Sequence, residues 1–196
     1  MYQSIMYGAE RGGLKIDRAA AAALNKSYTE EINVLRDNLR MLGLTNPGSS
    51  VVVENALREM GFEPEEFSPA GNARMDKIVL KKLESAKGPL AAAAGDLIKW
   101  RRLTKWRTVY CDKLVDAAGD DDIVHPSIRT HGARTGRSSV TNPPIQTIPK
   151  KKETRDLFIA DEGCELWSVD YNSEEARILA NASNEPELLR VFVEGD

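Results

Sequence analysis

Two carboxylates and an arginine lie close together near the end of the chain. Asp170 directly follows the mostly apolar run 166–169, Glu175 lies five positions later, and Arg177 comes after it. A hard divalent cation such as Mg²⁺ prefers oxygen ligands and usually takes one or two carboxylates together with substrate phosphates. The pattern is typical of a phosphoryl-transfer site that holds a metal and a triphosphate, with Asp170 and the carbonyl of Tyr171 as metal ligands.

Each of these side chains also has an ordinary structural role. An aspartate ahead of a helix commonly caps it, and a glutamate in the first helical turn is a favourable surface residue. Arg177 can form a surface salt bridge. It is the joint spacing after an apolar strand that favours a site over three separate structural roles.

A second string, residues 135–149, is polar and rich in turn formers. Its three prolines prevent a helix over 143–149. An arginine on such a loop can reach minor-groove acceptors, whose pattern depends little on base sequence, and short polar side chains can contact sugar or phosphate. The alternative is a surface loop with a basic tail at 150–152. The candidate DNA-binding residues here are Thr135, Arg137, Ser139, Asn142 and Gln146.

Helices must dominate the first 118 residues. Helical spacing of apolar residues, with Asp17 as N-cap and Gly43 as stop, predicts the first long helix. Further helices are expected over 51–60, 76–85, 89–116, 174–182 and from about 185. Strands are expected over 156–160 and 164–170, joined by a turn, with extended segments at 123–126 and 128–131. The fold class is therefore α+β, with a helical region 1–118 and a partial antiparallel sheet with helices over 119–196.

Composition excludes several classes of protein. The 196 residues carry a net charge of −3, are 41% hydrophobic and 29% charged, and contain no apolar run near the ~18 residues that span a bilayer. The start of the chain resembles no signal peptide, so a cytoplasmic location and two free cysteines are expected. Basic residues gather over 99–113 and 129–155, which favours a phosphate-facing surface on an acidic chain. A solvated charged face is the equal alternative.

Together the two strings resemble signature blocks of the family A (polymerase I type) DNA polymerases. The family pattern TGRLSSxxPNLQNIP followed by DYSQIELR corresponds to TGRSSVTNPPIQTIP and DYNSEEAR in this chain. Residues 10–17 resemble the family's entry into the thumb, 103–110 its thumb-helix block LxKLxxTY, and 124–126 the start of the palm. The last block is closer to phage-encoded members than to cellular ones.

The resemblance implies roles for individual residues. Asp170 would be the catalytic aspartate that binds Mg²⁺, Tyr171 would lend its carbonyl, and Glu175 would crowd the sugar 2′ position and reject ribonucleotides. Arg137 would contact the primer end in the minor groove, and Gln146 would lie along the duplex. Of the remaining residues, Lys151 and Arg177 would serve the incoming nucleotide, and Lys105 and Arg101 would contact the DNA backbone from the thumb.

Departures from the family pattern concern the loop more than the metal site. The differing positions are Ser138, Pro144, Thr147, Ser173 and Glu174. Residues 1–196 also contain neither the fingers helix nor the His-Asp-Glu block with the second catalytic aspartate. We therefore expect a thumb and the first part of a palm, which binds primer–template DNA and is inactive alone. In the intact enzyme the further partner is a deoxynucleoside triphosphate.

Several alternatives stay open at this stage. The chain can be a fragment prepared for expression, a truncated gene product, or one half of a split polymerase whose second polypeptide carries the fingers and remaining palm. It can also be a non-catalytic DNA-binding or assembly subunit with a degenerate polymerase fold. A Mg²⁺-dependent nuclease would need more carboxylates near Asp170. An incomplete sheet leaves an unpaired edge, so dimerisation or aggregation is expected.

Overall fold

The computed structural model describes residues 2–69, 71, 73–85 and 87–194. By packing, the chain divides into two compact units, Met1–Asp161 and Glu162–Asp196. Each is described by itself. The division by packing does not test the boundary between thumb and palm that the sequence predicts at 118/119.

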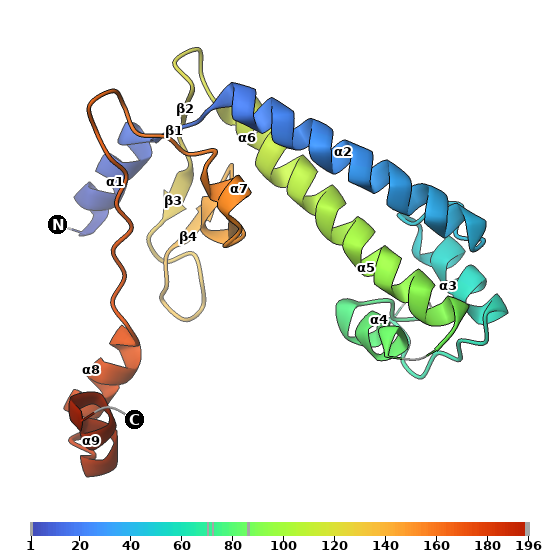
Figure 1. The fold of residues 1–196 in the computed structure, drawn as a ribbon. Coiled ribbons are helices and arrows are strands. Elements are labelled where there is room, and N and C mark those ends of the chain that lie inside the picture. The colour runs from blue at the N-terminus through green and yellow to red at the C-terminus, as the bar shows by residue number, and fades with distance from the viewer. Residues whose placement is uncertain (1, 70, 72, 86, 195–196) are drawn as a thin grey trace. The chain divides into compact units, whose positions relative to one another are not determined.

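The first unit is built around two long helices. Helix α2 (Arg18–Met41) and helix α5 (Pro89–Trp106) run side by side (Figure 1). The predicted cap is confirmed, because the Asp17 carboxylate accepts a hydrogen bond from the amide of Ala20 at 2.8 Å. Helix α5 continues through a π-helical segment, η1 (Arg107–Asp112), into α6 (Lys113–Ala117). The helix predicted over 89–116 is thus present, with a π-helical interruption.

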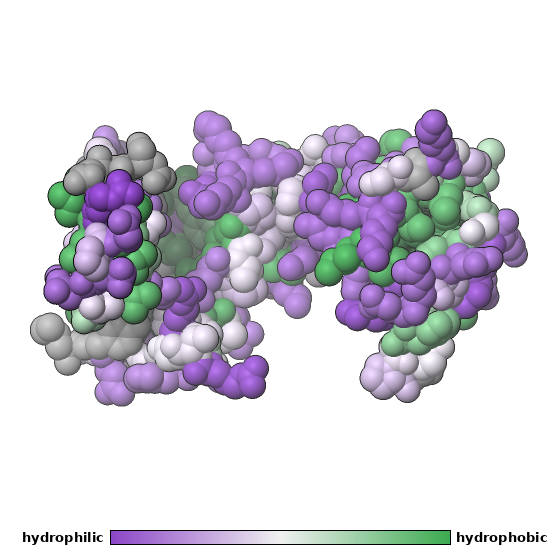
Figure 2. All heavy atoms as spheres, turned by 90° about the horizontal axis from the view of Figure 1, so that it is seen from below, coloured by the Kyte–Doolittle hydropathy of each residue, from purple (hydrophilic) through white to green (hydrophobic). Residues whose placement is uncertain are grey.

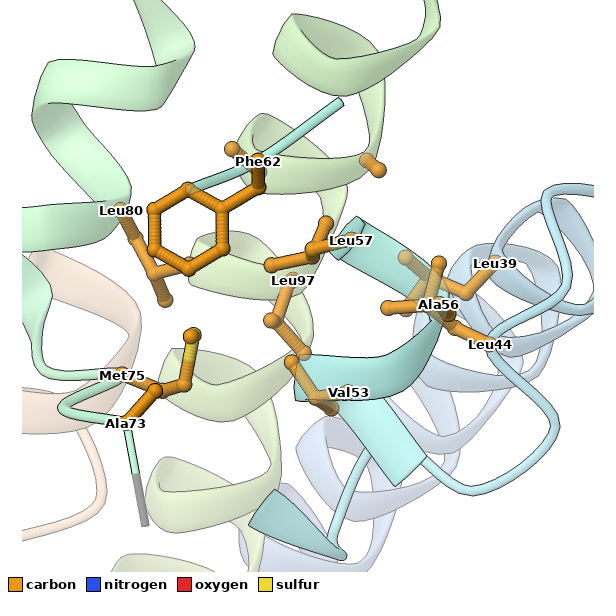
Figure 3. Packing of buried hydrophobic residues seen from close by; sticks show 12 residues of the cluster. Leu39, Leu44, Val53, Ala56, Leu57, Phe62, Ala73, Met75, Leu80 and Leu97 are labelled. Atoms are coloured by element: carbon orange, nitrogen blue, oxygen red, sulfur yellow. The ribbon is translucent and has the colours of Figure 1, made fainter. Parts of the chain in front are cut away.

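Two shorter helices close the far end of this pair. Helix α3 (Ser50–Glu59) and helix α4 (Lys77–Glu84) match the predicted segments to within about one residue at each end. Their apolar faces meet α5, and Figure 3 shows Phe62, Met75 and Leu80 lying around Leu97. The buried residues of this core are Leu39, Leu44, Val53, Ala56, Leu57, Phe62, Ala73, Met75, Leu80, Ala93, Ala94 and Leu97.

Two small antiparallel sheets lie at the other end of α2. Strand β1 (Leu14–Lys15) pairs with β2 (Ile123–Val124), and β3 (Ser127–Arg129) pairs with β4 (Ser139–Thr141). Helix α1 (Tyr2–Gly12) contacts β3. The 3₁₀-helix η2 (Ile145–Thr147) and the short helix α7 (Lys152–Arg155) follow β4. A second core of Ile16, Ala21, Leu114, Val124 and Leu157 joins these parts to the long helices.

The two strands predicted before Asp170 are wrong. Residues 156–160 follow α7, and Phe158 forms only an isolated bridge with Ile16. Residues 164–170 are described as irregular and exposed throughout. A strand is stable only when a neighbouring strand takes its backbone hydrogen bonds, and residues 162–194 form no ladder that could do so. The α+β class itself is confirmed.

The second unit carries two helices, as predicted. Helix α8 (Glu174–Ser183) and helix α9 (Pro186–Glu194) pack against each other, and Ala180 is buried between exposed apolar neighbours. Hydrophobic spheres appear among hydrophilic ones at the left of Figure 2, where these helices lie. Among the described residues, no helix combines the length and apolar character that crossing a membrane requires.

Candidate functional site

Asp170 and Tyr171 lie on the exposed segment ahead of α8. Ser173, with a left-handed φ of 55°, is the N-cap residue of that helix, so Asp170 does not have the ordinary capping role. Tyr171 is 75% exposed. Glu175 lies in the first turn of α8 and is exposed as well. Thus two exposed carboxylates lie within six residues of chain, on either side of the start of α8.

This cluster supplies only part of a metal site. Over the described part of the chain, no three His, Cys, Asp or Glu side chains come together in an arrangement that holds a metal ion. One carboxylate with one carbonyl suits a Mg²⁺ ion that takes its remaining ligands from phosphates and water. A two-metal clamp needs further carboxylates. The residues present therefore fit one side of a Mg²⁺ site.

Arg177 braces the turn that carries Asp170. Its Nε donates a hydrogen bond to the carbonyl of Asn172 at 2.9 Å, and an Nη atom lies 3.4 Å from the carbonyl of Phe192. The guanidinium also lies 4.9 Å from the centre of the Phe192 ring. These contacts tie Asn172, two residues after Asp170, to both helices of the second unit, a role that sequence spacing did not indicate.

The DNA-binding candidates of the polar string share one hairpin and the turn after it. Thr135 and Arg137 lie exposed on the connection between β3 and β4, and Ser139 begins β4. Gly132 allows the connection to close, because a Cβ there would lie 1.8 Å from the Ser139 hydroxyl. Asn142 follows β4 with a left-handed φ of 52°. The loop that was expected at 135–149 therefore contains the short strand β4 and the 3₁₀-helix η2, and only part of it is exposed.

Gln146 helps to hold this turn in place. Its side-chain Oε1 accepts a hydrogen bond from the amide of Val140 at 3.1 Å. Tyr110, buried on the π-helical segment η1, donates its hydroxyl to the carbonyl of Thr147. Residues 103–110 and the polar string are thus bonded to each other through two residues that lie 37 positions apart.

The long helix α5 contributes a basic groove together with α4. Lys105 is exposed there. Arg101 is half-buried and donates a hydrogen bond to the carbonyl of Met75, and burial lowers the pKa of its guanidinium. The basic residues that line the groove are Lys77, Lys81, Lys99, Arg101, Arg102 and Lys105, with Glu84 as the acid.

Lys77 and Lys81 were missed by sequence reasoning. They lie on α4, far from the basic stretch 99–113 in sequence, and the spatial pairing of α4 with α5 brings them to it. A second hollow on α5 is lined by Ser50, Ser68 and Thr104 beside Lys105. Small hydroxyl side chains next to cations suit contacts to a phosphodiester backbone. Only the tertiary arrangement shows that these residues meet.

Lys151 lies at the start of α7, and its ammonium already contacts two other side chains. Its ammonium donates a hydrogen bond to Glu153 at 2.7 Å, which lowers the pKa of that carboxyl. The same ammonium lies 4.9 Å from the centre of the Trp106 ring, at the end of α5. Lys151 therefore links the polar string to the basic groove.

Comparison with known proteins agrees with these features. The sequence model of DNA polymerase family A matches residues 17–196. The chain is 30% identical over 176 residues to a DNA polymerase of Mycobacterium phage D29, covering 89% of this chain and 26% of the relative. It is 32% identical over 201 residues to the thermostable DNA polymerase I of Thermus aquaticus, covering 95% and 23%. The chain thus spans about a quarter of the length of these relatives.

A solved structure shares the fold. The POL domain of Pol1 from M. smegmatis, in complex with DNA primer-template and dNTP, superposes with a TM-score of 0.80 at 23% identity, covering 95% of this chain and 34% of that one. The family model matches residues 17–196, which is most of the sequence. The chain belongs to DNA polymerase family A.

Proposed function

We propose that this chain is the DNA-holding part of a DNA-directed DNA polymerase. In the intact enzyme it serves template-directed, Mg²⁺-dependent nucleotidyl transfer during DNA replication. Residues 1–118 form the thumb, and 119–196 form the first part of the palm. Alone, the chain binds primer–template DNA and does not extend it. The bound DNA and dNTP of the M. smegmatis relative support these partners.

The observation that carries the proposal is the bond between Tyr110 and Thr147. It fastens the helix with the basic groove to the turn that contains Gln146, and this turn follows the hairpin whose connection carries Arg137. A duplex needs both: cations that attract its phosphates and a fixed polar group that reaches minor-groove acceptors. The link makes these two elements parts of one compact unit, as a polymerase surface requires.

Charge separation within the thumb also favours DNA binding. The groove between α4 and α5 has six basic residues and one acid, on a chain with net charge −3. Neutralising phosphates with such cations releases condensed counterions, which makes binding salt-dependent. The overall acidity therefore does not oppose a DNA-binding role.

Asp170 is proposed as a Mg²⁺ ligand, with the carbonyl of Tyr171 beside it. When bound, the metal would neutralise charge on the triphosphate and activate the attacking hydroxyl. Glu175, exposed one turn into α8, is proposed to limit the space at the sugar 2′ position. Arg177 is proposed to act on the nucleotide indirectly, because its guanidinium already holds the turn that carries Asp170.

The exposed segment before Asp170 marks where further palm structure would bind. Trp167, Val169 and Tyr171 alternate along it and are 79%, 87% and 75% exposed. Alternating apolar side chains on an extended segment are typical of a strand with one buried face. The remaining palm, in the same or in a second polypeptide, would supply the neighbouring strands and the second catalytic aspartate.

DNA binding is tested by fluorescence anisotropy of a labelled primer–template duplex at several salt concentrations. We expect salt-sensitive binding that Arg137→Ala weakens by roughly 1–3 kcal/mol, the range for a good groove contact. Arg36→Ala is the matched control, because Arg36 is exposed on α2 and bonds only to the nearby Asn33. Equal effects of the two substitutions, or no binding at low salt, would reject the DNA-holding role.

Inactivity is tested by primer extension with Mg²⁺ and all four deoxynucleoside triphosphates. We expect no extension by this chain, since one carboxylate cannot hold two metals. Addition of a polypeptide with the remaining palm and fingers should restore extension, and Asp170→Asn should abolish the restored activity. Extension by the chain alone that survives Asp170→Asn would refute the role of this aspartate.

A further inference from the structure

Two cations from distant parts of the chain lie against one aromatic ring. The guanidinium of Arg102 lies 5.2 Å from the centre of the Trp106 ring, and the ammonium of Lys151 lies 4.9 Å from it. Arg102 belongs to the groove of α5, whereas Lys151 precedes α7. The two charges are therefore no farther apart than the sum of these distances.

The ring itself is held firmly. Trp106 is the last residue of α5 and packs, partly buried, against the core of Tyr28, Ile32, Leu35, Leu103 and Cys111. The Tyr28 ring, nearly fully buried, lies 6.1 Å away at an interplanar angle of 45°. A ring so packed offers a fixed negative face on which a flexible ammonium stem can rest.

We propose that Arg102 and Lys151 form a phosphate-binding pair for the nucleic-acid backbone, with Trp106 as its positioning residue. This proposal rests on the proposed DNA-holding function and adds to it a site that joins the two basic stretches of the chain. Arg102 was not among the residues expected to bind DNA, Trp106 was given no role, and Lys151, which the family resemblance assigned to the incoming nucleotide, is here assigned to the backbone.

The physical reason is pre-organisation. Two like charges near each other repel, and a free lysine loses several rotatable bonds when it binds phosphate. The ring face and the Glu153 carboxylate offset the repulsion and hold Lys151 in place. An ammonium has three donors, of which Glu153 takes one, so the others remain for a phosphate oxygen. Trp106 acts through the cations and touches no ligand itself.

A mutant cycle tests this role by duplex anisotropy at fixed low salt. The four chains are the unaltered chain, Trp106→Leu, the double variant Arg102→Met/Lys151→Met, and the triple variant. A cation–π contact at a half-exposed site predicts that Trp106→Leu weakens binding about two- to fivefold in the unaltered chain. In the double variant it should have no further effect. Trp106→Phe, which keeps a ring face, should recover most of the loss.

The control separates positioning from packing. Lys99 lies exposed in the same groove, but the cations on the Trp106 ring are Arg102 and Lys151. Trp106→Leu should therefore weaken duplex binding by the same factor in a Lys99→Met chain as in the unaltered chain. Circular dichroism checks that every variant folds. The salt slope should fall by about one for each cation removed. An equal loss from Trp106→Leu in the unaltered and double-variant chains would overturn the proposal, because the ring would then act through packing.

Spectroscopy supplies a second measurement. In a Trp100→Phe/Trp167→Phe chain, Trp106 is the sole tryptophan, and duplex binding should change its emission because a phosphate charge arrives beside the two cations that rest on its ring. The Arg102→Met/Lys151→Met chain should lose that change. If the duplex binds and the emission stays constant in both chains, the positioning role of Trp106 is rejected and the DNA-holding function is kept. If the duplex does not bind at all, the proposed DNA-holding function fails and this inference with it.

Discussion

The hydroxyl of Tyr110 donates a hydrogen bond to the backbone carbonyl of Thr147 and lies 3.0 Å from the hydroxyl of the same residue. Tyr110 is 3% exposed and sits on η1, between two α-helical stretches. One phenol group thereby holds the polar turn against the long helix.

Tyr110→Phe should lower the free energy of unfolding by about 1 kcal/mol, the net value of a partly buried hydrogen bond. It should also weaken duplex binding, because the turn that carries Gln146 would lose its anchor. Urea unfolding and anisotropy measure the two effects. Tyr7→Phe, on the exposed face of α1, is the matched control. Similar effects of both substitutions would show that the bond is unimportant.

Leu97→Ala should destabilise the helical end of the first unit by about 2–5 kcal/mol, because it leaves a cavity in a packed core. Leu97 is fully buried between Leu57, Phe62 and Leu80 (Figure 3). Ile78→Ala removes a similar volume from a side chain that is 69% exposed and should change stability little. Denaturant unfolding followed by circular dichroism compares them. A small effect of Leu97→Ala would contradict the packing described here.

Cys111 should make stability depend on pH in alkaline solution. Burial, with a smaller contribution from Asp112, raises the pKa of its thiol to about 11. The folded state then keeps a proton that the unfolded state releases from about pH 9 upward, so the free energy of unfolding falls between these pH values, by roughly 2–3 kcal/mol at most. Cys111→Ala should remove this part of the pH dependence. An unchanged pH profile in that variant would refute the assignment.

The exposed segment before Asp170 should cause self-association. Light scattering at increasing concentration should show a rising mean mass, because alternating apolar side chains on an unpaired segment promote pairing between chains. Val169→Lys should suppress the effect. Val34→Lys, at an exposed position of α2, should not. A constant monomer mass over the whole concentration range would contradict this expectation.

The sequence predicted α2, α3, α4, α5, α8 and α9 because their signals are local, whereas α1 was not predicted. Asp17, the spacing of apolar residues in α2 and the proline at the start of α5 act within one or two turns. The strands over 156–160 and 164–170 were wrong because strand formation depends on partners that local sequence does not specify. The β3–β4 pair was only partly foreseen, as an extended segment at 128–131, for the same reason.

The candidate site shows the same limit. Asp170, Arg137 and Gln146 were predicted from spacing and from their resemblance to a family pattern, and their roles remain proposals. Sequence could not show that Arg177 holds the turn before α8, nor that Lys151 reaches Trp106, because both depend on contacts between distant segments. The basic residues of α4 were overlooked because their charge matters only beside α5.

The π-helical segment η1 has a consequence for changes in chain length. Its turns are wider than those of an α-helix and take up more residues for the same rise. Removing one residue between Arg107 and Asp112 can therefore leave a continuous α-helix, in which the side chains after the segment keep nearly the same direction while Tyr110 inside it turns to another face. The long helix thus has one place where its length is adjustable, and this place lies beside the contact between Tyr110 and Thr147. A one-residue deletion there would separate the folding of the long helix from its attachment to Thr147.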